Sequence, residues 1–230
     1  MSKSLVGQIS TSGKDGMSQK LDKPVQLLVE GREYEHVFKH ISDSDTCSCI
    51  QVHDFSRVDQ SPRPLLASLP KFTGFANVRV IAVIRDAEDD PAAKHDQVRD
   101  AFRRAHLPEP KNAGQIQRGE PSTGYLIVPA SGPGCLETAF YNSATNQAIR
   151  DHVIECVDKC KANQNDNWRH KAIVHSMVAV SNTPEAPLAL SLKFGIWDRA
   201  SSEFGRLNAF LSELILESRR QASLPGRGLP

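Results

Sequence analysis

The stretch VRVIAVIRD (residues 78–86) decides the fold, because it is a nearly unbroken run of Val and Ile that ends in an acidic residue. Such a run is typical of a central strand that is buried on both faces of a parallel sheet. PAAKHDQVRDAFRRAHL (91–107) follows and has the spacing of an amphipathic helix that begins at Pro91. Together the two segments predict a strand followed by a crossover helix.

Three further strand-then-helix units accompany this one, which favours an α/β layer structure with right-handed crossovers and a mainly parallel sheet flanked by helices. Each pairs a short β-branched or apolar run with a segment of helical spacing. They are VQLLVE (25–30) with GREYEHVFKHI (31–41), CSCIQVHDF (47–55) with PRPLLASLPKF (62–72), and GYLIVPA (124–130) with LETAFYNSA (136–144).

Beyond residue 145 the pattern changes to helical periodicity, which predicts a C-terminal helical appendage. LALSLKFG (188–195) is the one short run there that reads as a strand. Ser, Gly and Lys dominate the first residues, and Pro, Gly and Arg dominate the last dozen. The sequence therefore predicts a flexible tail over 1–22, an α/β domain over 23–145, a helical extension on the same domain over 146–218, and a second tail over 219–230.

Composition limits the classes of protein to consider. The 230 residues are 39% hydrophobic and 24% charged, which is close to globular averages. A formal net charge of +1 predicts that any contact with nucleic acid is local. No apolar run approaches the roughly 20 residues of a membrane span, and no signal peptide is evident, so we expect a cytoplasmic protein without a membrane partner. The five cysteines are expected to be reduced.

Acidic and glycine residues follow three of the predicted strands. Glu30 and Gly31 follow the first, Asp86 ends the third, and Gly134 lies beyond the fourth. Ligands of open parallel sheets bind at the carboxyl ends of strands. Clustered carboxylates need a cation to offset their repulsion, and oxygen ligands suit Mg²⁺ or Mn²⁺. Gly31, which has no Cβ, would let a phosphate approach the backbone.

Here the sequence resembles a known family. LLVEGREYEHVF (27–38) and VIAVIRDAEDD (80–90) resemble the Toprim domain of topoisomerases, primases and overcoming-lysogenization-defect nucleases, whose motifs are a strand-terminal Glu-Gly and a strand-terminal Asp-x-Asp. Residues 25–215 are similar to the stand-alone, Toprim-related DUF3226 family. That likeness also rests on GYLIVPASGPGCLETAF (124–140), HKAIVHSMVAV (170–180) and GIWDRASSEFGRLNAFL (195–211). The resemblance implies a Toprim-like Rossmannoid fold.

The resemblance also implies roles for particular residues. Two positions depart from the family pattern, since position 88 is Glu where Asp is usual and position 34 is Tyr where relatives often have an acid. These departures favour one metal ion over two, with Glu33 as the only substitute for the missing ligand. The implied roles are acid/base catalyst or metal ligand for Glu30, metal ligand for Asp86, Glu88 and Glu137, stabilisation of phosphate charge by Lys171, and phosphate approach at Gly31 and Gly134.

Three interpretations of function remain open. The favoured one is a divalent-metal-dependent enzyme that cleaves phosphodiesters in DNA or RNA, a nuclease. The alternative is a non-catalytic, metal-dependent sensor of nucleotides or nucleic-acid ends, acting with a partner such as an ATPase in defence or repair. The third is a decayed site. An oligomer is compatible with all three. The cations expected to clamp phosphates are Arg32, Arg85, Arg103, Arg104 and Lys171.

Several other residues are expected to have structural roles. Asp90 precedes a helix and should cap it. The remaining predictions are packing by Trp197, surface or packing roles for His36 and His40, core positions inside a strand for Cys47 and Cys49, and burial for His152, Cys156 and Cys160, which recur every fourth residue on one helix face.

Overall fold

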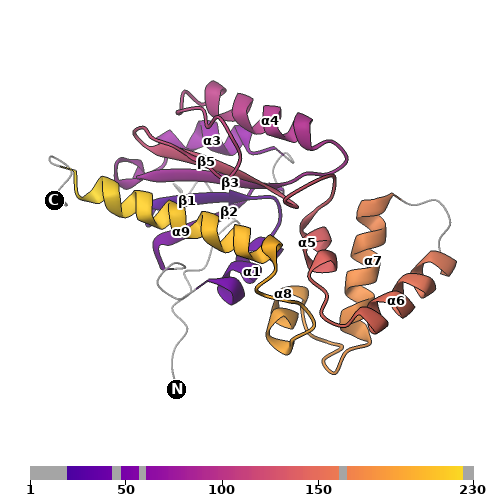
Figure 1. Ribbon diagram of the computed structural model, residues 1–230. Coiled ribbons are helices and arrows are strands. Elements are labelled where there is room, and N and C mark those ends of the chain that lie inside the picture. Colours follow the sequence, from indigo (N-terminus) through magenta and orange to yellow (C-terminus); the bar gives the residue numbers. More distant parts are fainter. Residues whose placement is uncertain (1–19, 43–47, 57–60, 161–164, 225–230) are drawn as a thin grey trace, which may run out of the picture.

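The computed structural model describes residues 20–42, 48–56, 61–160 and 165–224, and these form a sheet of five strands between two layers of helices (Figure 1). The strand order is β2-β1-β3-β5-β4, and all neighbouring strands are parallel except β4 and β5. This confirms the predicted fold class. The strands are β1 (Val25–Val29), β2 (Ile50–Asp54), β3 (Val80–Asp86), β4 (Ile116–Gln117) and β5 (Ser122–Val128).

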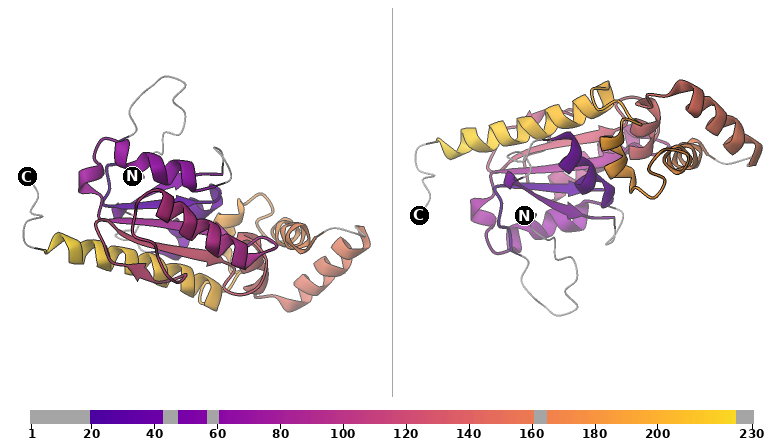
Figure 2. Two further views of the ribbon diagram at one scale, coloured as in Figure 1. Left: turned by 90° about the horizontal axis from the view of Figure 1, so that it is seen from above. Right: turned by 90° about the horizontal axis from the view of Figure 1, so that it is seen from below.

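Helices cover both faces of the sheet, and the views in Figure 2 show α4 and α9 on opposite sides of it. The α3 and α4 helices pack on one face, while α1 and α9 pack on the other. The helices are α1 (Glu33–Ile41), α3 (Arg63–Ser68), α4 (Pro91–Arg104), α5 (Leu136–Asn142), α6 (Gln147–Cys160), α7 (Asp166–Ala179), α8 (Leu188–Ser191) and α9 (Ser202–Ala222), with 3₁₀ turns η1 (Leu69–Lys71), η2 (Phe75–Asn77) and η3 (Leu192–Phe194).

The alternating side chains of β3 explain why its sequence is apolar throughout. Ile81 and Val83 point into the core beneath α3 and α4, while Ala82 and Ile84 point into the core beneath α1 and α9. Side chains of a strand alternate between faces, so a strand covered on both sides needs apolar residues at every position. The run of Val and Ile therefore indicates a central strand, as predicted.

The structure corrects the prediction of a strand over 188–195. These residues form α8 and η3, which pack against α1. The Trp197 indole N–H donates a hydrogen bond to Ser191 Oγ at 2.5 Å, and Trp197 is buried, which confirms its packing role. A short apolar run suits a buried helical turn as well as a strand, so the sequence pattern was ambiguous.

The cysteine predictions also need correction. Cys49 lies in a helical turn just before β2, so it is not inside the strand, and Cys47 lies outside the described residues. His152, Cys156 and Cys160 are exposed on α6. In the described part of the chain α6 packs chiefly on α7. A buried face was therefore the wrong expectation.

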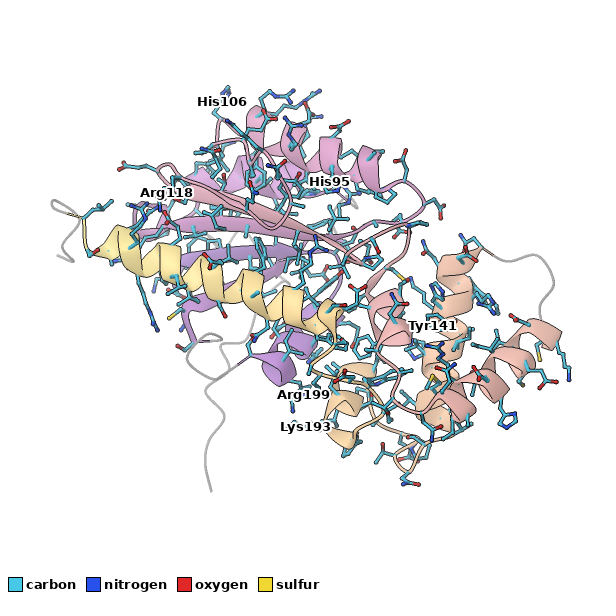
Figure 3. All side chains as sticks on the ribbon, viewed as in Figure 1. His95, His106, Arg118, Tyr141, Lys193 and Arg199 are labelled. Atoms are coloured by element: carbon cyan, nitrogen blue, oxygen red, sulfur yellow. The ribbon has the colours of Figure 1, made fainter. Side chains whose placement is uncertain are left out.

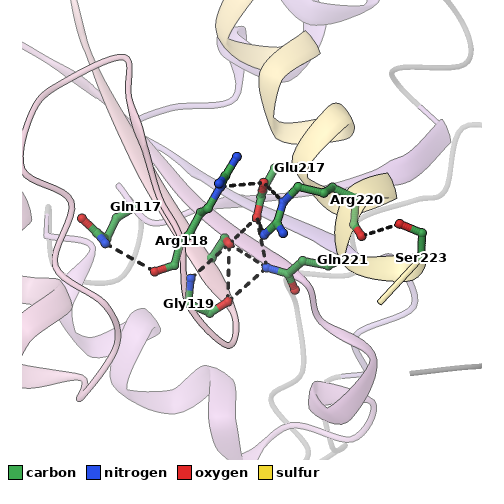
Figure 4. Close-up of polar contacts among 8 residues, drawn as sticks. Gln117, Arg118, Gly119, Glu217, Arg220, Gln221 and Ser223 are labelled. Atoms are coloured by element: carbon green, nitrogen blue, oxygen red, sulfur yellow. Dashed lines mark hydrogen bonds and ion pairs between the residues drawn. The ribbon is translucent and has the colours of Figure 1, made fainter. Parts of the chain in front are cut away.

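A polar network fixes the C-terminal half of α9 to the loop before β5 (Figure 4). Glu217 accepts hydrogen bonds from Ser122 Oγ at 2.7 Å and from Arg220 Nε at 2.7 Å. The Gln221 side-chain amide donates to Ser122 Oγ at 2.6 Å and to the Gly119 carbonyl at 3.1 Å. The hydrogen bond from Arg220 is the main cause that lowers the Glu217 pKa to about 2.

The predicted division of the chain is tested only in part. Residues 1–19 and 225–230 lie outside the described residues, so most of both predicted tails stays a prediction. The second tail, however, was predicted from residue 219, and α9 continues to Ala222. Among the described residues, we find no helix with the length and apolarity that crossing a bilayer would require.

Candidate functional site

The ends of β1, β3 and β5 meet at one edge of the sheet, and the predicted acidic residues lie there. Val29 is opposite Ile84, and Asp86 is opposite Val128, so the carboxyl ends of these strands are side by side. Glu30 directly follows β1, and its Oε2 accepts the Asp86 backbone N–H at 3.3 Å. The register between β1 and β3 therefore places Glu30 beside Asp86.

Asp86 is a buried carboxylate whose Oδ1 is held from two sides. The Tyr34 hydroxyl donates to it at 2.5 Å, and the Leu136 backbone N–H donates at 3.1 Å. Burial raises the Asp86 pKa well above its usual value; the Tyr34 hydrogen bond opposes this, and the charges of Glu30 and other nearby carboxylates add to it. The site therefore favours either a proton or a cation next to Asp86.

Tyr34, for which no role at the site was predicted, contacts Asp86 directly. Its side chain is 1% exposed, and burial together with Asp86 raises its pKa well above the usual value, so the phenol stays protonated. A protonated phenol can donate a hydrogen bond to a carboxylate, whereas an ionised acid at this position could not. Tyr34 thus fixes the orientation of Asp86 and is no substitute for a metal ligand.

Glu30 forms an ion pair with Arg85, which the sequence analysis had assigned to phosphate binding. Arg85 Nε lies 3.1 Å from Glu30 Oε2, and their side chains are only 5% and 15% exposed. Burial raises the Glu30 pKa, partly offset by Arg85 and Lys94 and reinforced by Glu88. A carboxyl group with a raised pKa suits proton transfer near neutral pH.

Glu88 has an unusual backbone conformation and a fixed side chain. Its φ of 52° lies in the left-handed region, which is costly for a residue with a Cβ and is often found at functional sites. Its backbone exchanges two hydrogen bonds with Gly134, at 2.7 and 2.8 Å. Asn167 Nδ2 on α7 donates to Glu88 Oε2 at 2.9 Å. Glu88 is therefore anchored by the loop after β5 and by α7.

The two glycines that were predicted to let a phosphate approach the backbone have structural roles. Gly134 has φ +144°, and a Cβ there would lie 2.6 Å from the Thr138 hydroxyl, so only glycine fits. Gly31 has φ +112°, and a Cβ there would meet nothing within 4 Å. Its N–H donates to Asp54 Oδ1 at 3.1 Å, so that amide is not free to bind a phosphate. Phosphate approach at either glycine stays a prediction.

Lys171 and Glu137 lie on the helices that border this edge. Glu137 is half-buried in the first turn of α5, and Lys171 is exposed on α7. Burial acts to lower the Lys171 pKa, but Glu137, Cys135, Asp86 and Glu88 outweigh it and raise the pKa overall. The structure thus brings the ammonium group into the field of three of the four predicted carboxylates.

Residues that the sequence analysis did not assign to the site include Asn167 and Cys135. Burial raises the Cys135 pKa to about 12, so its thiol stays protonated and is a poor nucleophile. Asn167 lies 79 residues from Glu88 in the chain. An amide at the start of a helix carries no sequence signal for such a contact. Only the approach of α7 to the strand ends reveals it.

The carboxylates supply the oxygen ligands that a divalent cation prefers, but few of them converge on one point. Within the described residues, no three Asp, Glu, His or Cys side chains converge closely enough to hold one ion. Mg²⁺ usually binds through one or two carboxylates, completing its octahedron with water and substrate phosphate. Asp86 ends β3 and Glu88 follows two residues later, so the two supply carboxylate oxygens close together in the chain, and neighbouring acids add to the raised pKa of Asp86. Together they fit one ion of this kind.

Comparison with known proteins places the chain in a family. No curated protein matches it. Two solved structures of the C-terminal region of the Xanthomonas campestris pv. campestris OLD protein are similar at 11% identity. The structure phased with mercury has a TM-score of 0.45 over 85% of this chain and 98% of that one, and the structure phased with iodine has 0.46 over 86% and 98%. The family model described as DUF3226, protein of unknown function, matches residues 24–216, so the chain belongs to the DUF3226 family.

Proposed function

We propose that this chain is a divalent-metal-dependent hydrolase of phosphodiester bonds in nucleic acid, a nuclease of the Toprim type. One observation carries the proposal: Glu30 contacts Asp86 at the carboxyl edge of a parallel sheet, and the charges of Glu88 and Lys171 act on the same place. Acidic oxygens beside a cationic side chain suit binding of a metal-associated phosphate. The resemblance to Toprim motifs points to the same chemistry.

Asp86 and Glu88 would hold Mg²⁺ or Mn²⁺, and Glu30 and Glu137, whose charges also act on Asp86, would be the further acids of the site. The bound ion would neutralise phosphate charge and lower the pKa of a water molecule. Tyr34 and the Leu136 amide hold one oxygen of Asp86, which leaves Asp86 Oδ2 to face a ligand. Asn167 similarly holds Glu88 Oε2. This arrangement supports a single ion more than a pair.

Glu30 and Lys171 would act on the reacting groups. Glu30 would accept a proton from the attacking water, and its raised pKa makes it an adequate base that can later return the proton. Arg85 keeps the Glu30 carboxylate in place through the 3.1 Å ion pair. The Lys171 ammonium would stabilise negative charge that develops on the phosphate oxygens.

The test is a cleavage assay on supercoiled plasmid, single-stranded DNA and RNA, with Mn²⁺ or with EDTA. The wild-type chain should cut at least one of them only with the metal, and Glu30→Gln should reduce the rate by about a hundred-fold or more. Glu185→Gln removes one exposed carboxylate away from the site and should cut normally. Mn²⁺-dependent cleavage at full rate by Glu30→Gln would contradict the assigned role.

One observation favours a second candidate, a non-catalytic sensor. Within the described residues no three metal-binding side chains converge, and a site with few protein ligands can bind a metal–nucleotide complex without hydrolysing it. Such a sensor would act with a partner, for example an ATPase. A filter-binding assay run alongside the cleavage assay separates the two candidates, because a sensor would bind the strand without cutting it. Calorimetric titration with Mn²⁺ addresses the decayed site, which would show no specific binding.

A further inference from the structure

The cations that the sequence offered as phosphate clamps are mostly paired with acids. Arg85 contacts Glu30, and Arg103 and Arg104 both contact Asp100 on α4. Lys193 and Arg199, in contrast, form none of the ion pairs found among the described residues, and both are exposed. Figure 3 shows them at the same edge of the molecule, beside α8 and below α1. Two exposed cations without an ion pair among the described residues therefore lie near each other.

Two histidines of α1 border these cations. α1 packs against α8 and η3, which places His40 in the field of Lys193 and Arg199. His40 Nδ1 is buried without a hydrogen-bond partner in the described structure, and His36 is exposed one turn before it. Lys39 lies between them, but its Nζ is 2.9 Å from Glu35 Oε1, so its charge is largely offset.

An exposed aromatic ring lies within the same region. Phe194 follows Lys193 in η3 and is 48% exposed, which makes it one of the few large apolar side chains left at the surface of the described residues. Gly195, with φ 73°, ends the 3₁₀ turn directly after it. An aromatic ring flanked by cations is the arrangement that binds single strands, because every base offers a face for stacking.

We propose that the α1–η3 surface, made of His36, His40, Lys193, Phe194 and Arg199, binds the backbone and one base of single-stranded nucleic acid. This inference rests on the proposed function, because it places the substrate of that same site. The nine residues of α1 begin just after Glu30 and end at this surface, a length of about 13 Å. A strand held here would reach the carboxylates within a few nucleotides. The exposed ring favours a nucleic acid over an acidic protein.

The test measures fluorescence anisotropy of a short labelled single-stranded DNA, and of its RNA equivalent, in EDTA so that nothing is cleaved. Lys193→Gln with Arg199→Gln should weaken binding and reduce the slope of log affinity against log salt by about 1.4. Phe194→Ala should weaken binding by at least about five-fold. Lys111→Gln with Arg219→Gln removes the same charge from two exposed positions, in the loop after α4 and in the last turn of α9, and should leave binding unchanged. Circular dichroism confirms that each variant is folded.

The outcomes separate this inference from the proposed hydrolysis. If the Lys193 and Arg199 double variant binds as tightly as wild type, the inference is wrong, even where wild type cleaves DNA with Mn²⁺. If binding depends on these residues but wild type never cleaves, the inference holds and hydrolysis fails. If polyglutamate displaces the strand and Phe194→Ala changes nothing, the surface binds acidic chains, which also overturns the inference.

Discussion

The Asp86 side chain shows how one buried group can be costly for folding and useful for ligand binding. Its carboxylate lies at the end of a central strand, where burial and neighbouring acids disfavour its charge. A raised carboxyl pKa means that, at pH values between the unfolded and the folded pKa, the folded state holds a proton that the unfolded chain has released. This group therefore lowers stability as pH rises above its unfolded pKa.

We expect Asp86→Asn to abolish metal-dependent cleavage and to raise the melting temperature by a few degrees at pH 7 without metal. Asparagine keeps an oxygen for Tyr34 and the Leu136 amide but carries no charge. The gain should shrink as pH falls, because wild-type Asp86 becomes neutral in both states. Differential scanning calorimetry at several pH values measures it. A lower melting temperature at pH 7 would contradict the charge argument.

Side-chain roles divide sharply into those the sequence could predict and those it could not. Glu30 and Asp86 follow from strand-end position, because parallel strands necessarily bring their carboxyl ends together. The contact between Tyr34 and Asp86 joins residues 52 apart in the chain. Because of this contact, the tyrosine that stands in place of an expected acid orients the Asp86 carboxylate. Asn167 was missed for the same reason. Periodicity locates a residue on an element but does not say what that element approaches.

At the scale of elements, α7 holds the loop that carries Glu88. We expect Asn167→Ala to weaken Mn²⁺ binding by about ten- to a hundred-fold, as loss of a residue that orients a metal ligand commonly does. Isothermal titration calorimetry measures the affinity. Asn112→Ala, in an exposed loop, serves as the control. An unchanged affinity in Asn167→Ala would show that Glu88 needs no such support.

The end of α9 offers a prediction of pH dependence. The Glu217 pKa is lowered to about 2, chiefly by the hydrogen bond from Arg220, so its stabilising effect is present above the unfolded value and is lost as pH falls. We expect Glu217→Gln to reduce the free energy of unfolding by about 1 to 3 kcal/mol at pH 7. The difference from wild type should decline between about pH 5 and pH 2.

Urea unfolding at each pH tests this, with Glu213→Gln, an exposed residue one turn earlier on α9, as the control. If the difference in the free energy of unfolding did not change with pH, packing and not the charge of Glu217 would fix α9 to the loop. Apolar runs made β1 and β3 predictable, of Val and Leu in β1 and of Val and Ile in β3. The two residues of β4 and the apolar turn of α8 were not, because short segments take their conformation from what packs on them.

At the scale of the whole molecule, metal binding should stabilise the fold. A ligand that binds only the folded state at about 100 times its dissociation constant adds about 2.7 kcal/mol. For a chain of this size that corresponds to a rise in melting temperature of about 5–10 °C. Thermal unfolding with Mn²⁺ and with EDTA measures it. Asp86→Asn should show no such rise, and an equal rise in that variant would place the metal elsewhere.

The late position of α9 in the chain affects how the protein is made. All five strands of the described residues precede Pro129, whereas α9, which covers one face of the sheet together with α1, begins at Ser202. At about 5–20 residues per second, a ribosome needs about 4 to 15 seconds to synthesise the intervening chain. During that interval the sheet presents bare apolar side chains to the crowded surroundings of the ribosome. Newly made chains of this family should therefore depend on holding chaperones until Leu207, Phe210, Leu211 and Leu214 emerge to close the core.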